Sequence, residues 1–147
     1  MTITFNSVDY IVMIIIAAAI IVGLVFWFVK KSHPAPIDDF SAKKISEEWL
    51  QIEELIKQDS PNAWKLAVLE ADKLVDYALK TLAVPGKDFG ERIRAINYQL
   101  PSIRNVWPAH IVRNKLVHES DYQLDKKTAV RSVQQFKEAL KTLKVLK

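Results

Sequence analysis

Three polar side chains lie within six positions of the stretch AHIVRNKLVHES, residues 109–120. They are an arginine, an amide and a histidine: Arg113, Asn114 and His118. A guanidinium can neutralise a phosphate, an imidazole can transfer protons near neutral pH, and an amide can orient either group. Together they supply what metal-free cleavage of RNA requires when the RNA's own 2′-hydroxyl is the attacking group. These residues are therefore the candidate catalytic set.

The helical spacing of the three side chains decides whether they can act together. At about 100° per residue, Asn114 and His118 lie one turn apart on nearly the same face, and Arg113 is long enough to swing towards it. This face continues a stripe of apolar residues, so we expect Asn114 and His118 to face inward. Burying an amide and an imidazole without partners costs about 1–3 kcal/mol each. A purely structural role in the core or an interface therefore stays open beside catalysis.

Basic side chains are concentrated in the C-terminal part of the chain. Residues 32–86 carry six lysines and arginines against ten acidic residues, whereas residues 87–147 carry thirteen against six. A basic half favours a polyanion such as RNA, although a solvated helical surface has the same composition. Arg104 and Lys115 are the expected RNA-binding residues. The chain has no cysteine and only three scattered histidines, so we expect neither a metal site nor a cofactor.

An uncharged apolar run near the N-terminus predicts a membrane anchor. Residues 10–29 would span about 30 Å as a helix, the thickness of a bilayer's hydrocarbon core. A signal peptide fits less well, because the run is long and no lysine or arginine precedes it. Lys30 and Lys31 follow the run, so residues 1–9 are expected outside the cytoplasm and the C-terminal domain inside it. The sequence thus predicts a single-pass membrane protein.

The remaining residues are expected to form a linker and a helical domain. Two prolines lie within residues 30–40, which we take as the linker. In residues 41–147, apolar side chains recur every three or four positions, and no stretch alternates as a strand does. Five helical segments are expected, with Ser41, Ser60 and Asp125 as N-caps of three of them. The predicted fold class is all-α, with one transmembrane helix followed by a bundle of four or five helices.

The segment RNKLVH resembles the catalytic motif of the HEPN superfamily (higher eukaryotes and prokaryotes nucleotide-binding), which is an arginine, a polar residue, three further residues and a histidine. That family is a small bundle of four or five helices with the motif late in the chain, and residues 41–147 are similar in length, helix count and motif position. The resemblance implies that Arg113 and His118 are the catalytic pair of a metal-independent ribonuclease, with Asn114 as the polar residue. It also implies a homodimer in which two motifs share a composite cleft.

Two functions stay open from the sequence. The first is a membrane-anchored, metal-independent endoribonuclease. The second is a non-catalytic, membrane-anchored module that dimerises or binds RNA or nucleotides and recruits a cytoplasmic protein partner. An acidic segment at the start of the helical domain favours the second function as a protein-facing surface; its carboxylates are Glu47, Glu48, Glu53 and Glu54.

Overall fold

The computed structural model describes the backbone of residues 7–32 and 37–146. The chain divides into two units, Met1–Pro34 and Ala35–Lys147. The described residues form six α-helices and one 3₁₀ helix, and they include no β-strand. The prediction of an all-α fold is therefore confirmed.

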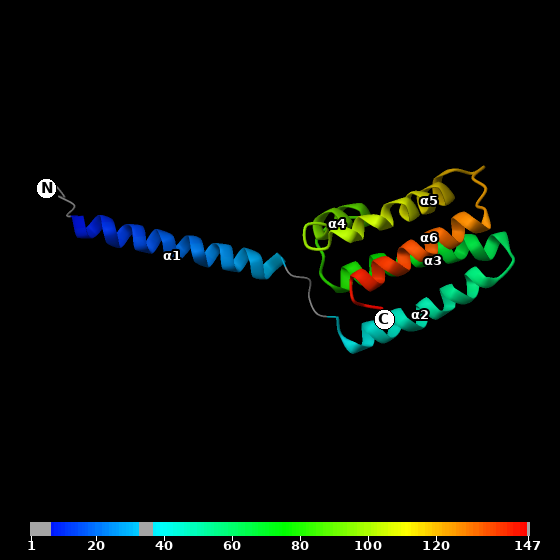
Figure 1. Ribbon diagram of the computed structural model, residues 1–147, viewed down its shortest axis with the longest axis horizontal. Helices are drawn as coiled ribbons and strands as arrows, with labels where there is room; N and C mark the ends of the chain where they lie inside the picture. The colour runs from blue at the N-terminus through cyan, green and yellow to red at the C-terminus, as the bar shows by residue number, and fades with distance from the viewer. Residues whose placement is uncertain (1–6, 33–36, 147) are drawn as a thin grey trace. The chain divides into compact units, whose positions relative to one another are not determined.

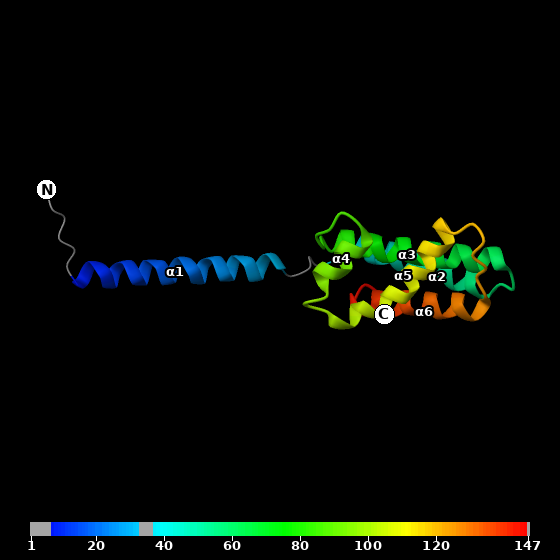
Figure 2. The same cartoon turned by 90° about the horizontal axis from the view of Figure 1, so that it is seen from above.

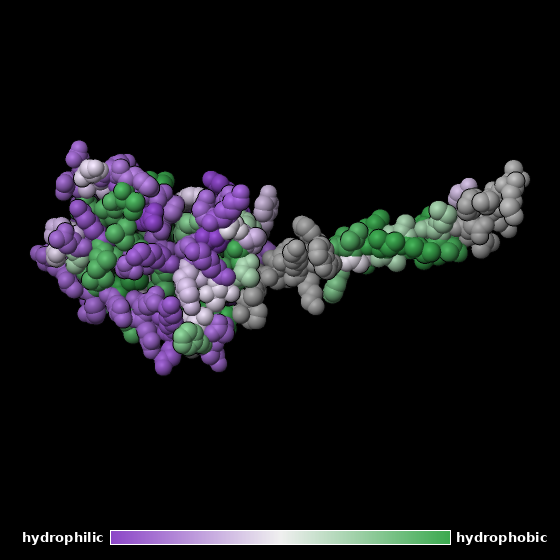
Figure 3. All heavy atoms as spheres, turned by 180° about the vertical axis from the view of Figure 1, so that it is seen from behind, coloured by the Kyte–Doolittle hydropathy of each residue, from purple (hydrophilic) through white to green (hydrophobic). Residues whose placement is uncertain are grey.

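The N-terminal unit contains a single helix, α1 (Ser7–Ser32), which extends three residues beyond the predicted apolar run at each end. Residues 1–6 of the predicted N-terminal tail and residues 33–36 of the predicted linker lie outside the described residues. The large apolar side chains from Tyr10 to Phe26 are about half exposed or more, and they form an almost continuous hydrophobic surface (Figure 3). Within the described part of the chain, no helix meets the combined requirement of length and apolarity for crossing a membrane.

The C-terminal unit is a bundle of four antiparallel helices with two short elements at one end (Figures 1 and 2). The four long helices are α2 (Asp39–Lys57), α3 (Pro61–Thr81), α5 (Trp107–His118) and α6 (Lys126–Thr142). The short elements, α4 (Phe89–Ile96) and the 3₁₀ helix η1 (Pro101–Val106), connect α3 to α5. Helix α3 packs against α2, α5 and α6. All buried core residues lie between Ile45 and Val145, so this unit contains a complete core of its own.

The N-caps agree with the sequence prediction for two helices and differ for one. Ser60 caps α3 and Asp125 caps α6, as predicted. Helix α2 is capped by Asp38 instead of Ser41, since the Asp38 carboxylate accepts a hydrogen bond from the Ser41 backbone amide at 2.9 Å. Ser41 itself is buried, and its hydroxyl lies 3.3 Å from the Tyr77 hydroxyl on α3. A side chain used in the core is not free to cap the helix.

The 3₁₀ helix sets which face of α5 is buried. Residues three apart eclipse one another in a 3₁₀ helix, and both Ile103 and Val106 of η1 are buried. The same spacing continues into α5, where Ala109 is buried and Val112 and Leu116 pack against the core. The residues of α5 that face the core therefore come one or two positions earlier in the sequence than a continuous α-helical repeat from Ile103 predicts.

This register corrects the prediction that Asn114 and His118 face inward. Asn114 is half-buried and His118 is exposed. Two apolar residues of the same predicted stripe are also open to solvent, with exposed fractions of 52% for Ile111 and 51% for Val117. The prediction was wrong because it extended α-helical periodicity through η1, where the chain winds more tightly.

Helices α3 and α6 both end in a left-handed residue that is not glycine. Ala83 has φ 54° and Lys144 has φ 58°. The next backbone amide reaches back to the carbonyl five residues earlier in each case, from Val84 to Leu79 at 3.0 Å and from Val145 to Leu140 at 3.1 Å. This is the Schellman arrangement, in which glycine is favoured because a Cβ strains the left-handed conformation.

Replacing Ala83 by glycine should therefore stabilise the bundle. We expect Ala83→Gly to raise the free energy of unfolding by about 1 kcal/mol in a denaturant titration. The matched control is Ala95→Gly, because Ala95 is exposed within α4, where glycine costs about 1 kcal/mol. Equal destabilisation by both changes would contradict the left-handed conformation at position 83.

Candidate functional site

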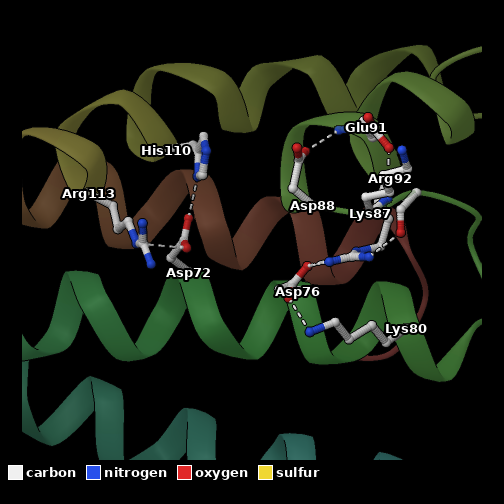
Figure 4. Close-up of polar contacts among 10 residues, drawn as sticks. Asp72, Asp76, Lys80, Lys87, Asp88, Glu91, Arg92, His110 and Arg113 are labelled. Carbon is white, nitrogen blue, oxygen red and sulfur yellow. Dashed lines mark hydrogen bonds and ion pairs between the residues drawn. The ribbon is translucent and has the colours of Figure 1, made fainter. Parts of the chain in front are cut away.

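A buried carboxylate on α3 binds two side chains of α5 (Figure 4). Asp72 is 4% exposed, and its Oδ1 lies 2.7 Å from Nδ1 of His110. Its Oδ2 lies 3.2 Å from Nε of Arg113. This second contact is an ion pair and not a hydrogen bond, because the Nε–H of Arg113 is not directed at the oxygen. Asp72 therefore fixes α5 to α3 at two positions that are three residues apart.

The imidazole of His110 is held from three sides. Its ring stacks on Phe89 of α4, with centroids 4.3 Å apart and planes inclined by 16°. The Trp107 ring approaches it edge-on at 5.9 Å, and Asp72 occupies Nδ1. His110 is thus a core histidine with a fixed orientation, and it forms part of a site that the sequence analysis did not identify.

A second aspartate on α3 holds the segment that leads into α4 (Figure 4). Asp76 lies one turn after Asp72 and accepts from Nε of the buried Arg92 at 2.9 Å. Nη2 of Arg92 lies 2.8 Å from the same oxygen, and Lys80 pairs with the other carboxylate oxygen at 2.7 Å. One face of α3 therefore anchors both α5 and α4 through buried or half-buried carboxylates.

The turn before α4 has a conformation that only glycine adopts readily. Gly86 has φ 153°, and a Cβ there would lie 2.6 Å from the Arg92 backbone nitrogen. The Gly86 carbonyl accepts a hydrogen bond from Nη1 of Arg92 at 2.6 Å. Asp88 caps α4 by accepting from the Glu91 amide at 2.8 Å, and the Glu91 carboxylate accepts from the Lys87 amide at 2.8 Å. Gly86 is thus explained by the backbone conformation of this turn.

Helices α3, α4 and α5 line an open cleft of about 630 Å³. Its charged lining is predominantly basic, with Lys73, Lys80, Lys87, Arg92, Arg94 and Arg113 against Asp72, Asp76 and Asp88. Asp72 and Asp76 pair with cations of the same lining, Lys73 pairs with Glu70, and Asp88 caps α4. Lys87 and Arg94 are left without an ion pair among the described residues. The electrostatic character of the cleft therefore favours an anionic ligand.

The structure brings two of the three candidate catalytic residues together. Nη1 of Arg113 donates to Oδ1 of Asn114 at 3.1 Å, and both side chains line the cleft. His118 is the last residue of α5, one turn beyond Asn114, and does not line the cleft. Within the described residues, His118 makes no hydrogen bond or ion pair. The Arg113 guanidinium is thus held by Asp72 and Asn114.

The two predicted RNA-binding residues are both exposed but lie in different surroundings. Arg104 belongs to η1 and lines a second, smaller cleft. Lys115 belongs to α5, and its Nζ lies 5.5 Å from the centroid of the Tyr122 ring. The structure does not bring these two side chains into one cluster.

Comparisons with known proteins do not add a family or a relative. No family matches the chain, and no curated protein or solved structure is significantly similar to it. Among the described residues, no group of three or more histidine or acidic side chains is arranged to hold a metal ion. The features of this chain that point to a function are therefore the motif and the geometry of α5.

Removing the charge of Asp72 should destabilise the bundle, because Arg113 loses its ionic partner and a neutral amide binds His110 less strongly than a carboxylate does. We expect Asp72→Asn to lower the free energy of unfolding by about 2 kcal/mol in a denaturant titration. Asp121→Asn is the matched control, since Asp121 lies exposed in the turn after α5 and should change stability by less than about 0.5 kcal/mol. Indistinguishable effects of the two changes would show that the Asp72 contacts do not stabilise the fold.

Proposed function

We propose that this chain is a membrane-anchored, metal-independent endoribonuclease of the HEPN type. The observation that carries the proposal is the arrangement of Arg113, Asn114 and His118 on α5. The guanidinium is hydrogen-bonded to the amide, and the imidazole one turn later is exposed and free of protein partners within the described residues. A free imidazole one turn from an amide that holds a guanidinium is suited to acid–base chemistry on a phosphodiester.

The reaction is an attack of the RNA's 2′-oxygen on the adjacent phosphorus. The bond to the 5′-oxygen breaks, which leaves a 2′,3′-cyclic phosphate and a 5′-hydroxyl. His118 transfers a proton in this step, and the guanidinium of Arg113 neutralises the charge on the pentavalent phosphate. Asn114 keeps the guanidinium in place, and the exposed side chains of Arg104 and Lys115 bind the RNA backbone.

A homodimer completes the site in this proposal. Ile111 and Val117 flank Asn114 on α5, and both are about half exposed. Apolar side chains beside a polar motif are typical of a surface that a second subunit covers. A two-fold contact along this face brings the His118 side chains of both copies to one composite cleft.

The membrane anchor of the proposal is residues 10–29. This run contains no charged residue, and the described apolar side chains of α1 are exposed on all sides, as for a helix whose surroundings are apolar. Lys30 and Lys31 follow the run and favour a cytoplasmic position for the bundle. The enzyme is therefore a single-pass protein with its C-terminal domain in the cytoplasm.

One observation favours a non-catalytic membrane-anchored module instead. The ion pair with Asp72 compensates part of the Arg113 charge and gives this arginine a structural role. The acidic surface expected to recruit a protein partner is, however, less available than predicted. Its four carboxylates all pair with lysines: Glu47 with Lys43, Glu48 with Lys44, Glu54 with Lys57 and Glu53 with Lys137. The hydrogen bond from Lys137 is the largest cause of a lowered pKa for the Glu53 carboxyl.

The catalytic proposal predicts that substitutions of the two histidines of α5 change different properties, cleavage activity at His118 and stability at His110. His118→Ala should reduce RNA cleavage by about 10²–10⁴-fold and leave the melting temperature unchanged, because His118 is exposed. His110→Ala should lower the melting temperature, because its ring is packed and paired with Asp72. Both variants of the full-length protein are assayed in detergent with chelator present, and the products are analysed for 2′,3′-cyclic phosphate.

Arg113→Ala should also nearly abolish cleavage, and RNA that lacks the 2′-hydroxyl at the cut site should be inert. If the wild type cleaves RNA no faster than folded His118→Ala, the ribonuclease proposal is wrong. A loss of stability in both Arg113→Ala and His118→Ala, without any cleavage by the wild type, would favour the structural role.

The dimer proposal predicts a specific effect of a charge at Ile111. We expect Ile111→Glu to convert the protein to a monomer in light scattering and to reduce cleavage, because a buried unpaired carboxylate is strongly unfavourable in an interface. Val130→Glu is the matched control, since Val130 is similarly exposed (48%) but lies on α6. A monomeric wild type with full activity would contradict the composite site.

A further inference from the structure

A second cleft, of about 530 Å³, adjoins the first and shares two lining residues with it, Arg94 and Trp107. It lies at the end of the bundle where α4, the turn after α4, η1 and the start of α5 meet. Its other lining residues are Ile93, Asn97, Tyr98 and Arg104. Two arginines line it and no carboxylate does, so it attracts anions.

Two aromatic rings line this cleft. Tyr98 is 93% exposed in the turn after α4, which leaves its ring faces open to a ligand. The Trp107 ring is half-buried, and the guanidinium of Arg94 lies 5.6 Å from its centroid. Gly90 packs against this ring, and a Cβ there would lie 3.2 Å from the tryptophan, which is a tight contact. Open aromatic faces beside arginines are the arrangement with which proteins hold unstacked bases.

An unsatisfied amide oxygen lies in the same place. Oδ1 of Asn97 is buried and has no hydrogen-bond partner among the described residues. A buried acceptor without a donor is unfavourable, and such groups in native proteins usually have a functional or ligand-related explanation. The exocyclic amino group of a nucleobase is a donor of suitable chemistry for this oxygen, and the Asn97 side chain must turn towards the cleft to accept from it.

We infer that this cleft binds a nucleotide of single-stranded RNA. The base stacks on Tyr98 or Trp107, its amino group donates to Asn97, and the flanking phosphates contact Arg94 and Arg104. This inference deepens the proposed function and rests on it for the identity of the polymer. None of the five residues belongs to the Arg113, Asn114 and His118 set, so binding here can be measured apart from cleavage.

The position of the cleft suits a strand that continues to the catalytic motif. Trp107 begins α5 and Asn114 lies seven residues later, a rise of about 10 Å along the helix. This separation corresponds to about three stacked nucleotides at roughly 3.4 Å each. The cleft therefore holds a nucleotide to one side of the scissile phosphate and selects single-stranded substrates.

The test measures the affinity of full-length protein in detergent micelles for a fluorescent single-stranded oligonucleotide of about ten residues, by anisotropy. The oligonucleotide carries 2′-O-methyl groups, so it cannot be cleaved by 2′-hydroxyl attack. Tyr98→Ala should weaken binding by about 5- to 100-fold, whereas Tyr98→Phe should bind like the wild type because it keeps the stacking ring. The extreme exposure of Tyr98 means that neither change should affect folding.

The arginines provide the second arm of the test. Arg94→Ala and Arg104→Ala should each weaken binding and reduce the slope of log affinity against log salt by about 0.7. Arg131→Ala is the matched control, because Arg131 is exposed on α6 and lines neither cleft. Double-stranded RNA of the same length should bind more weakly than the single strand.

The outcomes separate this inference from the catalytic proposal. If Tyr98→Ala binds weakly and the wild type does not cleave ordinary RNA, nucleotide binding in the cleft is supported and the ribonuclease proposal is contradicted. If Tyr98→Ala binds and cleaves RNA as well as the wild type does, the proposed role of the cleft is contradicted and the ribonuclease proposal is unaffected. Equal losses for Tyr98→Ala and Tyr98→Phe, equal affinity for double-stranded RNA, or no binding by the wild type would each overturn the inference.

Discussion

The buried carboxylate of Asp72 determines how the motif-bearing helix sits in the bundle. A charge in the interior is strongly unfavourable unless charged or hydrogen-bonding groups surround it, and Asp72 obtains both of its partners from α5. Because His110 and Arg113 are three residues apart, their side chains leave the helix on one side and prevent it from rotating about its own axis. Asn114 thereby lies half-buried in the cleft beside Arg113, and His118 at the end of α5 is exposed to solvent.

The same face of α3 also organises the region around both clefts. Asp76 binds the buried Arg92, which in turn holds the Gly86 carbonyl and positions the start of α4. Phe89 then stacks on His110, so the two aspartate networks meet at a ring contact. Helix α3 therefore provides the support, whereas the side chains proposed to meet RNA lie on α4, the turn after it, η1 and α5. Preorganisation of this kind is what electrostatic catalysis and base stacking require.

Local features of the fold could be predicted from the sequence, whereas the long-range contacts of the site could not. Ser60 and Asp125 were identified as caps because a cap is determined by the residues directly next to it. The exposed face of α5 was assigned wrongly because the 3₁₀ turn at its start changes the residue spacing. The pairing of Asp72 with His110 joins residues 38 positions apart, which no local pattern encodes.

The most direct test of this account is a double-mutant cycle between Asp72 and Arg113, measured as free energies of unfolding in denaturant. If the carboxylate orients α5 through this arginine, Asp72→Asn and Arg113→Gln should be non-additive, with a coupling energy of about 1 kcal/mol or more. The parallel cycle of Asp72→Asn with His118→Gln should be additive, because His118 is exposed at the end of α5 and has no contact with Asp72 among the described residues. Additivity of the Asp72 and Arg113 changes within about 0.3 kcal/mol would contradict the account.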